Sequence, residues 1–179
     1  MKLNIQKFAV PEITGTGEVL RKMMVTYVNV GTSEAKVWEA QGIKTEESSL
    51  ELNPDISTIT DILGITYTDV NKMEVSQSID PNTLRMGAKL SEIMLDIYRR
   101  GALAEYSQFE VLIVYGFLGT EGAYEADLET GCTIIPNSIG GSSRVDMPFV
   151  INLSGNKTLG TVNALYPAET IVFTEAVSA

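Results

Sequence analysis

Histidine is absent from the 179-residue sequence, and cysteine occurs once, as Cys132. Without His, neither a Ser-His-Asp nor a Cys-His catalytic arrangement can form, and no metal can be held by imidazole. One Cys can make neither an internal disulfide nor a cysteine-cluster zinc site. The residues therefore predict no enzyme, no catalytic residue, no cofactor and no metal, and they leave a structural or binding role.

Basic residues are scarce. The chain has 13 Lys and Arg against 23 Asp and Glu, a formal net charge of −10, and a pI of about 4.5. Affinity for nucleic acid depends on Lys and Arg contacts to phosphates, so this balance argues against a nucleic-acid-binding protein. Hydrophobic residues make up 44% and charged residues 20%, which is typical of a globular protein. The length suits one domain spanning residues 1–179.

Long hydrophobic runs are also missing. The longest, Val111–Leu118, is interrupted by Gly116 and is far shorter than the roughly 20 residues of a membrane-spanning helix. The first residues, Met1–Lys7, show no apolar stretch of signal-peptide length. We therefore expect no membrane partner, folding in a cytoplasm, and a reduced, buried Cys132.

What is present is mostly β-pattern. Residues 23–30 alternate and are rich in β-branched and aromatic side chains, and 59–63 with 65–79 read as a hairpin whose second strand is half-buried. Residues 108–118 are almost continuously apolar, which predicts a strand buried on both faces, and 123–136 return as the next strand. One amphipathic helix is predicted over 88–100, with an apolar stripe at i, i+3, i+4 and i+7 and Gly101 as its stop. The predicted fold is mainly β, an antiparallel sandwich or barrel with this one flanking helix.

Two segments are predicted to be irregular. Residues 1–21 mix Pro and Gly with isolated apolar residues and read as an extended N-terminal arm. Residues 44–58 are polar and too long for a tight hairpin, and loops of about 15 residues are usually functional.

Three acidic residues, Glu125, Asp127 and Glu129, occupy alternate positions of one predicted strand, which places neighbours roughly 6.5–7 Å apart on one face. The plain interpretation is a solvated sheet face, with Tyr124, Ala126, Leu128 and Cys132 turned inward. A glycosidase-like carboxylate pair is disfavoured, because such a pair holds its two acids in different environments. Three like charges in line are tolerated only when water separates them. A wet acidic surface of this kind suits a passage for a polyanion.

Several segments resemble the major tail (tail tube) proteins of bacteriophages and prophages. The opening Met1–Ala9 looks like the start of structural proteins from phages of Gram-positive bacteria. Gly64–Val70, the strand ending at Ile79, and Gly87–Ile93 at the start of the helix resemble the middle of major tail proteins. The order of hairpin, long polar loop, hairpin, helix and further strands is similar too, so the resemblance spans most of the chain.

The resemblance implies a β-sandwich that forms hexameric rings stacked into a hollow tail tube, with DNA passing only transiently through the lumen. It implies a location in the virion tail, assembly in the host bacterial cytoplasm, and contacts with the tape measure, terminator and distal tail proteins. Glu125, Asp127 and Glu129 would then face the lumen. Contacts between subunits or rings would come from the arm and the loop, through Phe8, Pro11, Glu46, Glu47, Pro54 and Asp55.

Three alternatives stay open. A tail terminator or neck ring protein shares the fold class. A tube protein of a contractile tail or of a phage-tail-like bacteriocin would form the same kind of tube in another assembly. An adhesin or pilin-like sandwich would share the strands and the acidity but is expected to carry an export signal.

Overall fold

The computed structural model describes residues 17–45, 47–166 and 170–176. The fold is mainly β, and its one α-helix among these residues is α1 (Lys89–Arg100). Two short 3-10 helices are η1 (Arg21–Met23) and η2 (Leu103–Ser107). The strands are β1 (Met24–Asn29), β2 (Trp38–Ala40), β3 (Leu50–Glu51), β4 (Pro54–Thr60), β5 (Thr66–Met73), β6 (Ser76–Ile79), β7 (Phe109–Thr120), β8 (Ala123–Pro136), β9 (Phe149–Asn152), β10 (Lys157–Val162) and β11 (Phe173–Glu175).

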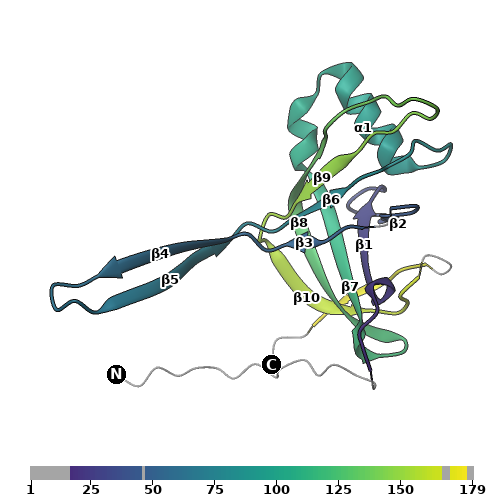
Figure 1. Cartoon of the computed structure of the whole chain (residues 1–179). Helices are drawn as coiled ribbons and strands as arrows, with labels where there is room; N and C mark the ends of the chain where they lie inside the picture. The colour runs from purple at the N-terminus through teal and green to yellow at the C-terminus, as the bar shows by residue number, and fades with distance from the viewer. Residues whose placement is uncertain (1–16, 46, 167–169, 177–179) are drawn as a thin grey trace.

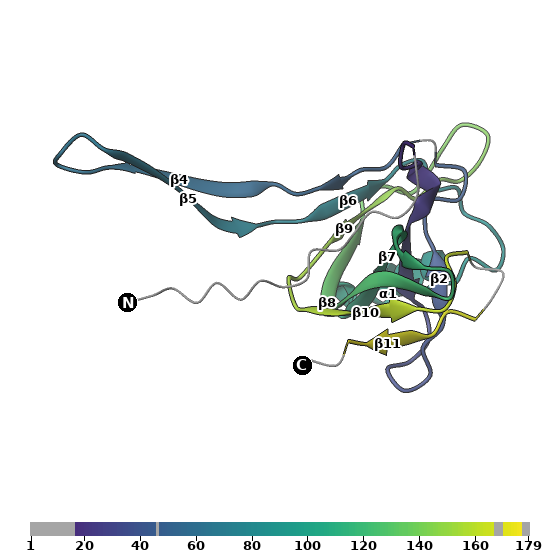
Figure 2. The ribbon, with the colours of Figure 1, turned by 90° about the horizontal axis from the view of Figure 1, so that it is seen from below.

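Nine of these strands form one curled antiparallel sheet in the order β2-β1-β7-β8-β9-β6-β3, with β10 joined to β8 and β11 to β10 (Figures 1 and 2). The first half of β8 pairs with β10 and its second half with β9. The register of β8 against β7 shifts where Glu110 opposes Thr130 and Phe109 opposes Cys132, and Gly131 there has φ +73°. This bulge bends β8, because an extra residue in one strand kinks the ladder.

The helix closes one face of the sheet, as predicted for residues 88–100. Leu90, Met94 and Ile97 are buried, and they pack with Val28, Val111, Ile134 and Phe149 of the sheet. Gly101 ends the helix in the left-handed conformation at φ +67°. The face of the helix that the sequence pattern predicts to be apolar is thus the face that packs on the sheet.

The start of the helix is capped from a distant strand. Ala88 provides no side-chain cap. Instead, the carboxylate of Glu39 in β2 accepts hydrogen bonds from the backbone N–H of Lys89 at 2.7 Å and of Leu90 at 3.3 Å. A carboxylate at this position satisfies otherwise unpaired N–H groups and complements the helix dipole. Glu39 therefore fastens β2 to α1.

The opposite face of the sheet has its own apolar cluster. Tyr27, Leu112 and Ala126 lie there with Val162 and Leu165 from the C-terminal part of the chain. The buried hydroxyl of Tyr27 donates to the carbonyl of Leu165 at 2.6 Å. Burial raises the pKa of Tyr27 to about 12. The burial on both faces predicted for residues 108–118 holds for Phe109 and Val111–Val114 in the first half of β7. Gln108 is exposed and residues 115–118 are only half-buried, so the prediction is wrong for the two ends of the run.

The segment predicted as a polar loop over 44–58 is partly strand. It contains β3 and the first residues of β4, so the following hairpin begins at Pro54 rather than near Ile59. The expectation of a half-buried second strand holds for Gln77 and Ile79 in β6 but is wrong for β5, in which every residue is exposed. Most of the predicted arm, including Phe8 and Pro11, lies outside the described residues, as does Glu46. Of the part that is described, Arg21 begins η1.

The hairpin of β4 and β5 projects from the body as a separate two-stranded sheet (Figures 1 and 2). Seven residues of extended strand reach about 23 Å at about 3.3 Å per residue. Ribbons of two strands are only marginally stable by themselves in water. The chain therefore extends an element that the described part of its own body does not cover.

We expect Glu39→Ala to lower the free energy of unfolding by about 1 kcal/mol, because α1 loses the carboxylate that accepts hydrogen bonds from its first two backbone N–H groups. Glu39→Gln keeps an acceptor oxygen and should lose less. Urea unfolding of monomeric samples measures both, with the exposed Glu34→Gln as control. Equal stability of all three variants would contradict the capping role.

We expect the protein to lose stability as pH rises from 10 toward 12. The folded state holds the Tyr27 proton with a pKa of about 12, above the ordinary value near 10, so the stabilisation is complete below pH 10 and is lost as pH approaches the folded pKa. Tyr27→Phe should make the unfolding free energy less steep across this window, whereas the exposed Tyr67→Phe should not. A pH series of urea unfolding curves tests this, and identical slopes in wild type and Tyr27→Phe would refute it.

Candidate functional site

Cross-strand pairing gives the β4–β5 hairpin two chemically different faces. Residues directly opposite one another in an antiparallel ladder point to the same face. One face carries, from base to tip, Pro54 with Met73, Ile56 with Val70, Thr58 with Thr68 and Thr60 with Thr66. The other face carries Asp55 with Lys72, Ser57 with Asp69 and Ile59 with Tyr67. Apolar side chains thus cover the base of one face and the tip of the other.

The tip is an ordered turn built around Asp61. Its carboxylate oxygen Oδ1 accepts hydrogen bonds from the backbone N–H of Leu63 at 2.8 Å and of Ile65 at 2.9 Å. Gly64 takes φ +79°, which completes the turn. Side-chain acceptance of this kind is how Asp organises tight turns. Asp61 thereby holds the backbone of an apolar tip in one conformation.

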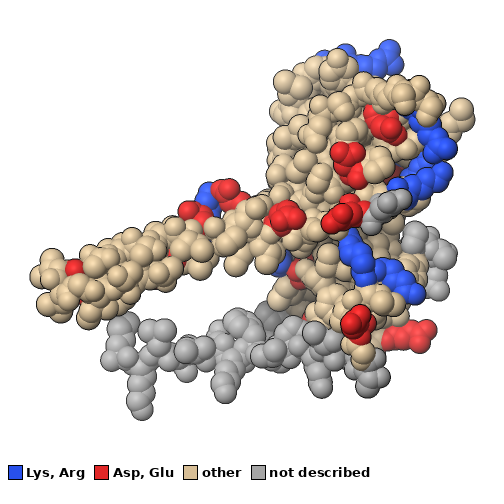
Figure 3. Space-filling view, in the orientation of Figure 1, with Lys and Arg blue, Asp and Glu red and all other residues tan. Residues whose placement is uncertain are grey.

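The tip and strands expose large apolar side chains to an unusual degree. Ile62 is 102% exposed and Leu63 is 78% exposed. The other exposed apolar side chains of the hairpin are Ile56, Ile59, Ile65, Tyr67, Val70 and Met73. Figure 3 shows a largely uncharged surface along the hairpin, with charge gathered near its base. So many exposed apolar side chains gathered on one element are typical of an interaction site.

The base of the hairpin is fixed to the body by Asn53. Its side-chain amide donates to the carbonyl of Glu74 at 3.0 Å and to the hydroxyl of Ser76 at 3.2 Å. The backbone N–H of Glu74 donates back to the carbonyl of Asn53 at 3.2 Å. Lys72 and Glu74 form an ion pair next to this junction. These contacts set the direction in which the hairpin leaves the sheet.

The structure places Pro54 and Asp55 at the base of this hairpin and Glu47 in the exposed connection that precedes β3. These were predicted as contact residues in an irregular loop, and the two in β4 instead belong to a regular ribbon. The sequence did not single out Ile62 and Leu63. The available signal was the run Asp-Ile-Leu-Gly-Ile, which puts apolar residues in a turn where polar ones are usual.

The three acidic residues of β8 are not equivalent. Glu129 is 2% exposed, and its Oε2 accepts from the backbone N–H of Gly155 at 2.9 Å. The ammonium of Lys157 lies 2.8 Å from Asp127 Oδ2 and 3.9 Å from Glu129 Oε1. Glu125 is only half-buried. The expectation of three solvated carboxylates is therefore corrected, because Glu129 and Asp127 are held by hydrogen bonds and by a lysine from β10.

The bulge at Gly131 also changes which residues share a face. Ala126 and Leu128 turn toward the cluster around Tyr27, as expected, but Cys132 lies in the cluster beneath the helix. The extra residue in β8 reverses the alternation beyond it. Burial raises the pKa of the Cys132 thiol to about 11, so this Cys stays a neutral core residue.

Tyr115, on the neighbouring strand β7, contacts the acidic residues of β8. Its hydroxyl donates to Asp127 Oδ2 at 3.0 Å. Burial, together with the nearby charge of Asp127, raises the pKa of Tyr115 above its ordinary range. One carboxylate oxygen of Asp127 is thus shared by a phenol and an ammonium group.

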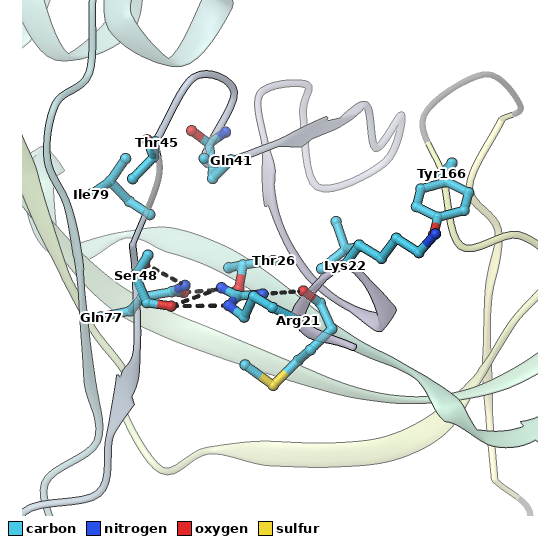
Figure 4. A pocket seen from close by; sticks show the side chains of 12 residues that line it. Arg21, Lys22, Thr26, Gln41, Thr45, Ser48, Gln77, Ile79 and Tyr166 are labelled. Carbon is cyan, nitrogen blue, oxygen red and sulfur yellow. Dashed lines mark hydrogen bonds between the residues drawn. The ribbon is translucent and has the colours of Figure 1, made fainter. Parts of the chain in front are cut away.

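A pocket of roughly 340 Å³ lies between β1, β6 and the segment around residues 41–48 (Figure 4). Arg21 donates from Nε and Nη2 to the carbonyl of Ser48 at 3.0 and 2.9 Å. The buried side chains of Thr26 and Gln77 are linked at 2.8 Å, and Gln77 in turn donates to the Ser48 hydroxyl at 3.0 Å. The polar wall of the pocket is therefore held together by its own hydrogen bonds. Sequence reasoning missed it because its residues come from four separate segments.

No group of three or more His, Cys, Asp or Glu that could hold a metal occurs among the residues that the structure describes. In the same part of the chain, no helix has the length and apolar character needed to cross a membrane.

No protein-family model matches the chain, and no curated protein matches its sequence. One solved structure with a similar fold is described as "Cryo-EM structure of the anti-feeding prophage cap (AFP tube terminating cap)". The two chains share 11% sequence identity with a TM-score of 0.48, over 84% of this chain and 95% of that chain. A likeness of this degree does not define a function, and the proposal below rests on the residues of this protein.

We expect Glu129→Ala to destabilise the fold by about 1–3 kcal/mol, because it removes a buried acceptor and leaves the N–H of Gly155 unpaired. Glu125→Ala, at the half-buried end of the same face, should change stability by less than about 0.5 kcal/mol. Thermal and urea unfolding compare the two, with Glu129→Gln as the variant that keeps an acceptor oxygen. Equal losses for Glu125→Ala and Glu129→Ala would show that the acids are equivalent after all.

Proposed function

We propose that this protein is a structural component of a phage tail that assembles with copies of itself into rings, and that these rings stack into a tail tube. The single observation that carries the self-assembly is the β4–β5 hairpin, an ordered apolar ribbon outside the body of its own chain. The tail context rests on the sequence resemblance to major tail proteins.

A hairpin that fits a different surface of the next copy makes a head-to-tail contact. Such contacts are heterologous, and they generate closed rings when the rotation closes or helical tubes when it does not. Two hairpins packing on each other would instead give a closed dimer with two-fold symmetry. A long projection that points away from its own body favours the first arrangement (Figure 2).

The energetics favour a cooperative assembly over isolated pairs. Burying the eight large apolar side chains of the hairpin from their exposed state gains on the order of 10 kcal/mol. Association costs an estimated 4–15 kcal/mol in lost freedom of motion, so one contact gives weak binding. In a closed ring every copy makes the contact twice, once with its hairpin and once as receiver, which raises the overall affinity.

The acidic face of β8 is the candidate wall of the passage in this proposal. Glu125 and Asp127 are half-buried and would line this wall, whereas Glu129 is buried. With Lys157 beside Asp127, the two carboxylates leave a net charge of about −1 per copy, and a ring multiplies this charge. A wall of the same sign as DNA repels the phosphates and keeps a hydrated layer between them. The tape measure, terminator and distal tail proteins would be its partners within the tail.

Electron microscopy of the purified protein, with sedimentation velocity over a range of concentrations, tests the proposed function. Long hollow tubes are the expected result. Single rings that do not stack would favour a tail terminator or neck ring protein. A strictly monomeric protein at high concentration, at every salt and temperature tried, would refute self-assembly.

We expect the double substitution Ile62→Ser and Leu63→Ser to raise the concentration needed for assembly at least tenfold, because both side chains are at the apolar tip. The fold of the monomer should be unchanged, since neither side chain packs on the body. Met86→Ser, at an equally exposed apolar side chain outside the hairpin, is the matched control. Sedimentation velocity measures assembly and circular dichroism checks the fold. Normal assembly of the double variant would contradict the role of the tip.

A further inference from the structure

The pocket near Arg21 has the properties of a receiver for the hairpin. It lies between β1 on one side and β6 with the segment before β3 on the other, and the hairpin leaves from β3 and β6 and projects away from the body (Figures 1 and 2). A hairpin tip therefore cannot reach the pocket of its own chain. A contact between the two would join separate copies, head to tail.

The charges of the two surfaces are opposite. The lining of the pocket includes Arg21 and Lys22 and no acidic residue, although the chain as a whole carries a net charge of −10. The hairpin from 54 to 73 has three aspartates and one lysine. Copies of a strongly acidic protein repel one another, so a local cationic patch directs where an acidic segment docks.

The apolar character of the two surfaces also matches. Met24, Val25 and Ile79 contribute to the lining of the pocket. Tyr166, which is exposed, also lines the pocket. The exposed Leu20 and Ile43 are sequence neighbours of the lining residues Arg21 and Gly42. The volume of the pocket, roughly 340 Å³, lies in the range of sites that enclose a small ligand or a side-chain anchor.

The polar groups of the pocket wall do not need a polar ligand. Arg21 donates to the carbonyl oxygens of Ser48 and Met24, and the Thr26, Gln77 and Ser48 side chains bond to one another (Figure 4). An apolar side chain that enters leaves these hydrogen bonds intact. The Lys22 side chain extends toward Tyr166 at the other side of the pocket (Figure 4).

We propose that the tip of the hairpin, Ile62 and Leu63, docks in the pocket lined by Arg21, Lys22 and Tyr166 of a second copy of this chain. The inference rests on the proposed self-assembly and specifies its joint. Asp61 fixes the shape of the tip before docking, which reduces the ordering cost of binding. Of the three aspartates of the hairpin, Asp61 belongs to the tip and is therefore the one that docking brings near the cations of the receiver.

Disulfide trapping on assembled particles tests the joint. The Leu63→Cys and Ile43→Cys proteins are prepared separately, mixed under assembly conditions and exposed to a mild oxidant. A disulfide forms only where the two Cα atoms come within about 4.4–6.8 Å. The buried Cys132 is present in both proteins, and wild type reports its background.

The expected result is a mixed covalent dimer at least ten times more abundant than with Leu103→Cys in place of Ile43→Cys. Leu103 is an exposed apolar residue after the helix and is not among the residues that line the pocket. If particles form but the disulfide between positions 63 and 43 is no more abundant than that between 63 and 103, the tip does not dock in this pocket. That result would contradict the inference and leave the proposed function standing. Dimers formed by Leu63→Cys alone would indicate tip-to-tip packing and also contradict the inference. Absence of any particles with the wild-type protein refutes the proposed function itself.

Charge reversal gives an independent measurement. Lys22→Glu should raise the assembly concentration at least tenfold, because the lining of the pocket would lose its net positive charge and with it the attraction for the acidic hairpin. Arg99→Glu makes the same change in net charge at the exposed end of α1 and should leave assembly within about twofold of wild type. Equal effects of the two variants would show that only net charge matters, and they would contradict a specific cationic receiver.

Discussion

The organisation of this protein depends on the apolar β4–β5 ribbon, which the described part of its own body leaves uncovered. Exposure of this much apolar surface to water is unfavourable, and a two-stranded hairpin by itself is only marginally stable. Hydrogen bonds nevertheless order the ribbon at both ends: Asn53 fixes its base to the body, and Asp61 holds the turn at its tip. An element whose base and tip are ordered by hydrogen bonds while its apolar side chains remain exposed is suited to contact with another molecule.

The body provides the platform from which this ribbon projects. Its curled sheet is covered on one face by α1, which Glu39 ties to β2, and on the other by the C-terminal segment around Leu165. The bend of β8 at Gly131 lets one strand pair with β10 in its first half and β9 in its second. Glu129 stabilises that corner by accepting from Gly155. Two apolar clusters on opposite faces make the body stable enough to support a free ribbon.

Periodicity in the sequence was enough to predict the mainly β fold, the helix over 88–100 and the burial of Phe109–Val114, because each depends on a local alternation or an i, i+3, i+4 stripe. Periodicity could not predict features that depend on residues from distant parts of the chain. The polar residues around Pro54 and Asp55 suggested a loop, yet they form a strand because Met73 and Lys72 pair with them across the hairpin. The spacing of Glu125, Asp127 and Glu129 indicated one face but could not reveal Lys157, which arrives from a strand 30 residues away from Asp127. The pocket was invisible for the same reason, since no single segment contains enough of it to form a motif.

Hydrogen–deuterium exchange of the hairpin amides, in dilute monomer and in assembled particles, tests most directly whether a second copy covers the ribbon. Strands β4 and β5 should exchange rapidly in the monomer and slow by at least tenfold on assembly, together with the segments that line the pocket. The helix α1, already packed on its own sheet, should change little. Equally rapid exchange of the hairpin in both states would mean that assembly leaves the ribbon uncovered, and this result would contradict the central claim.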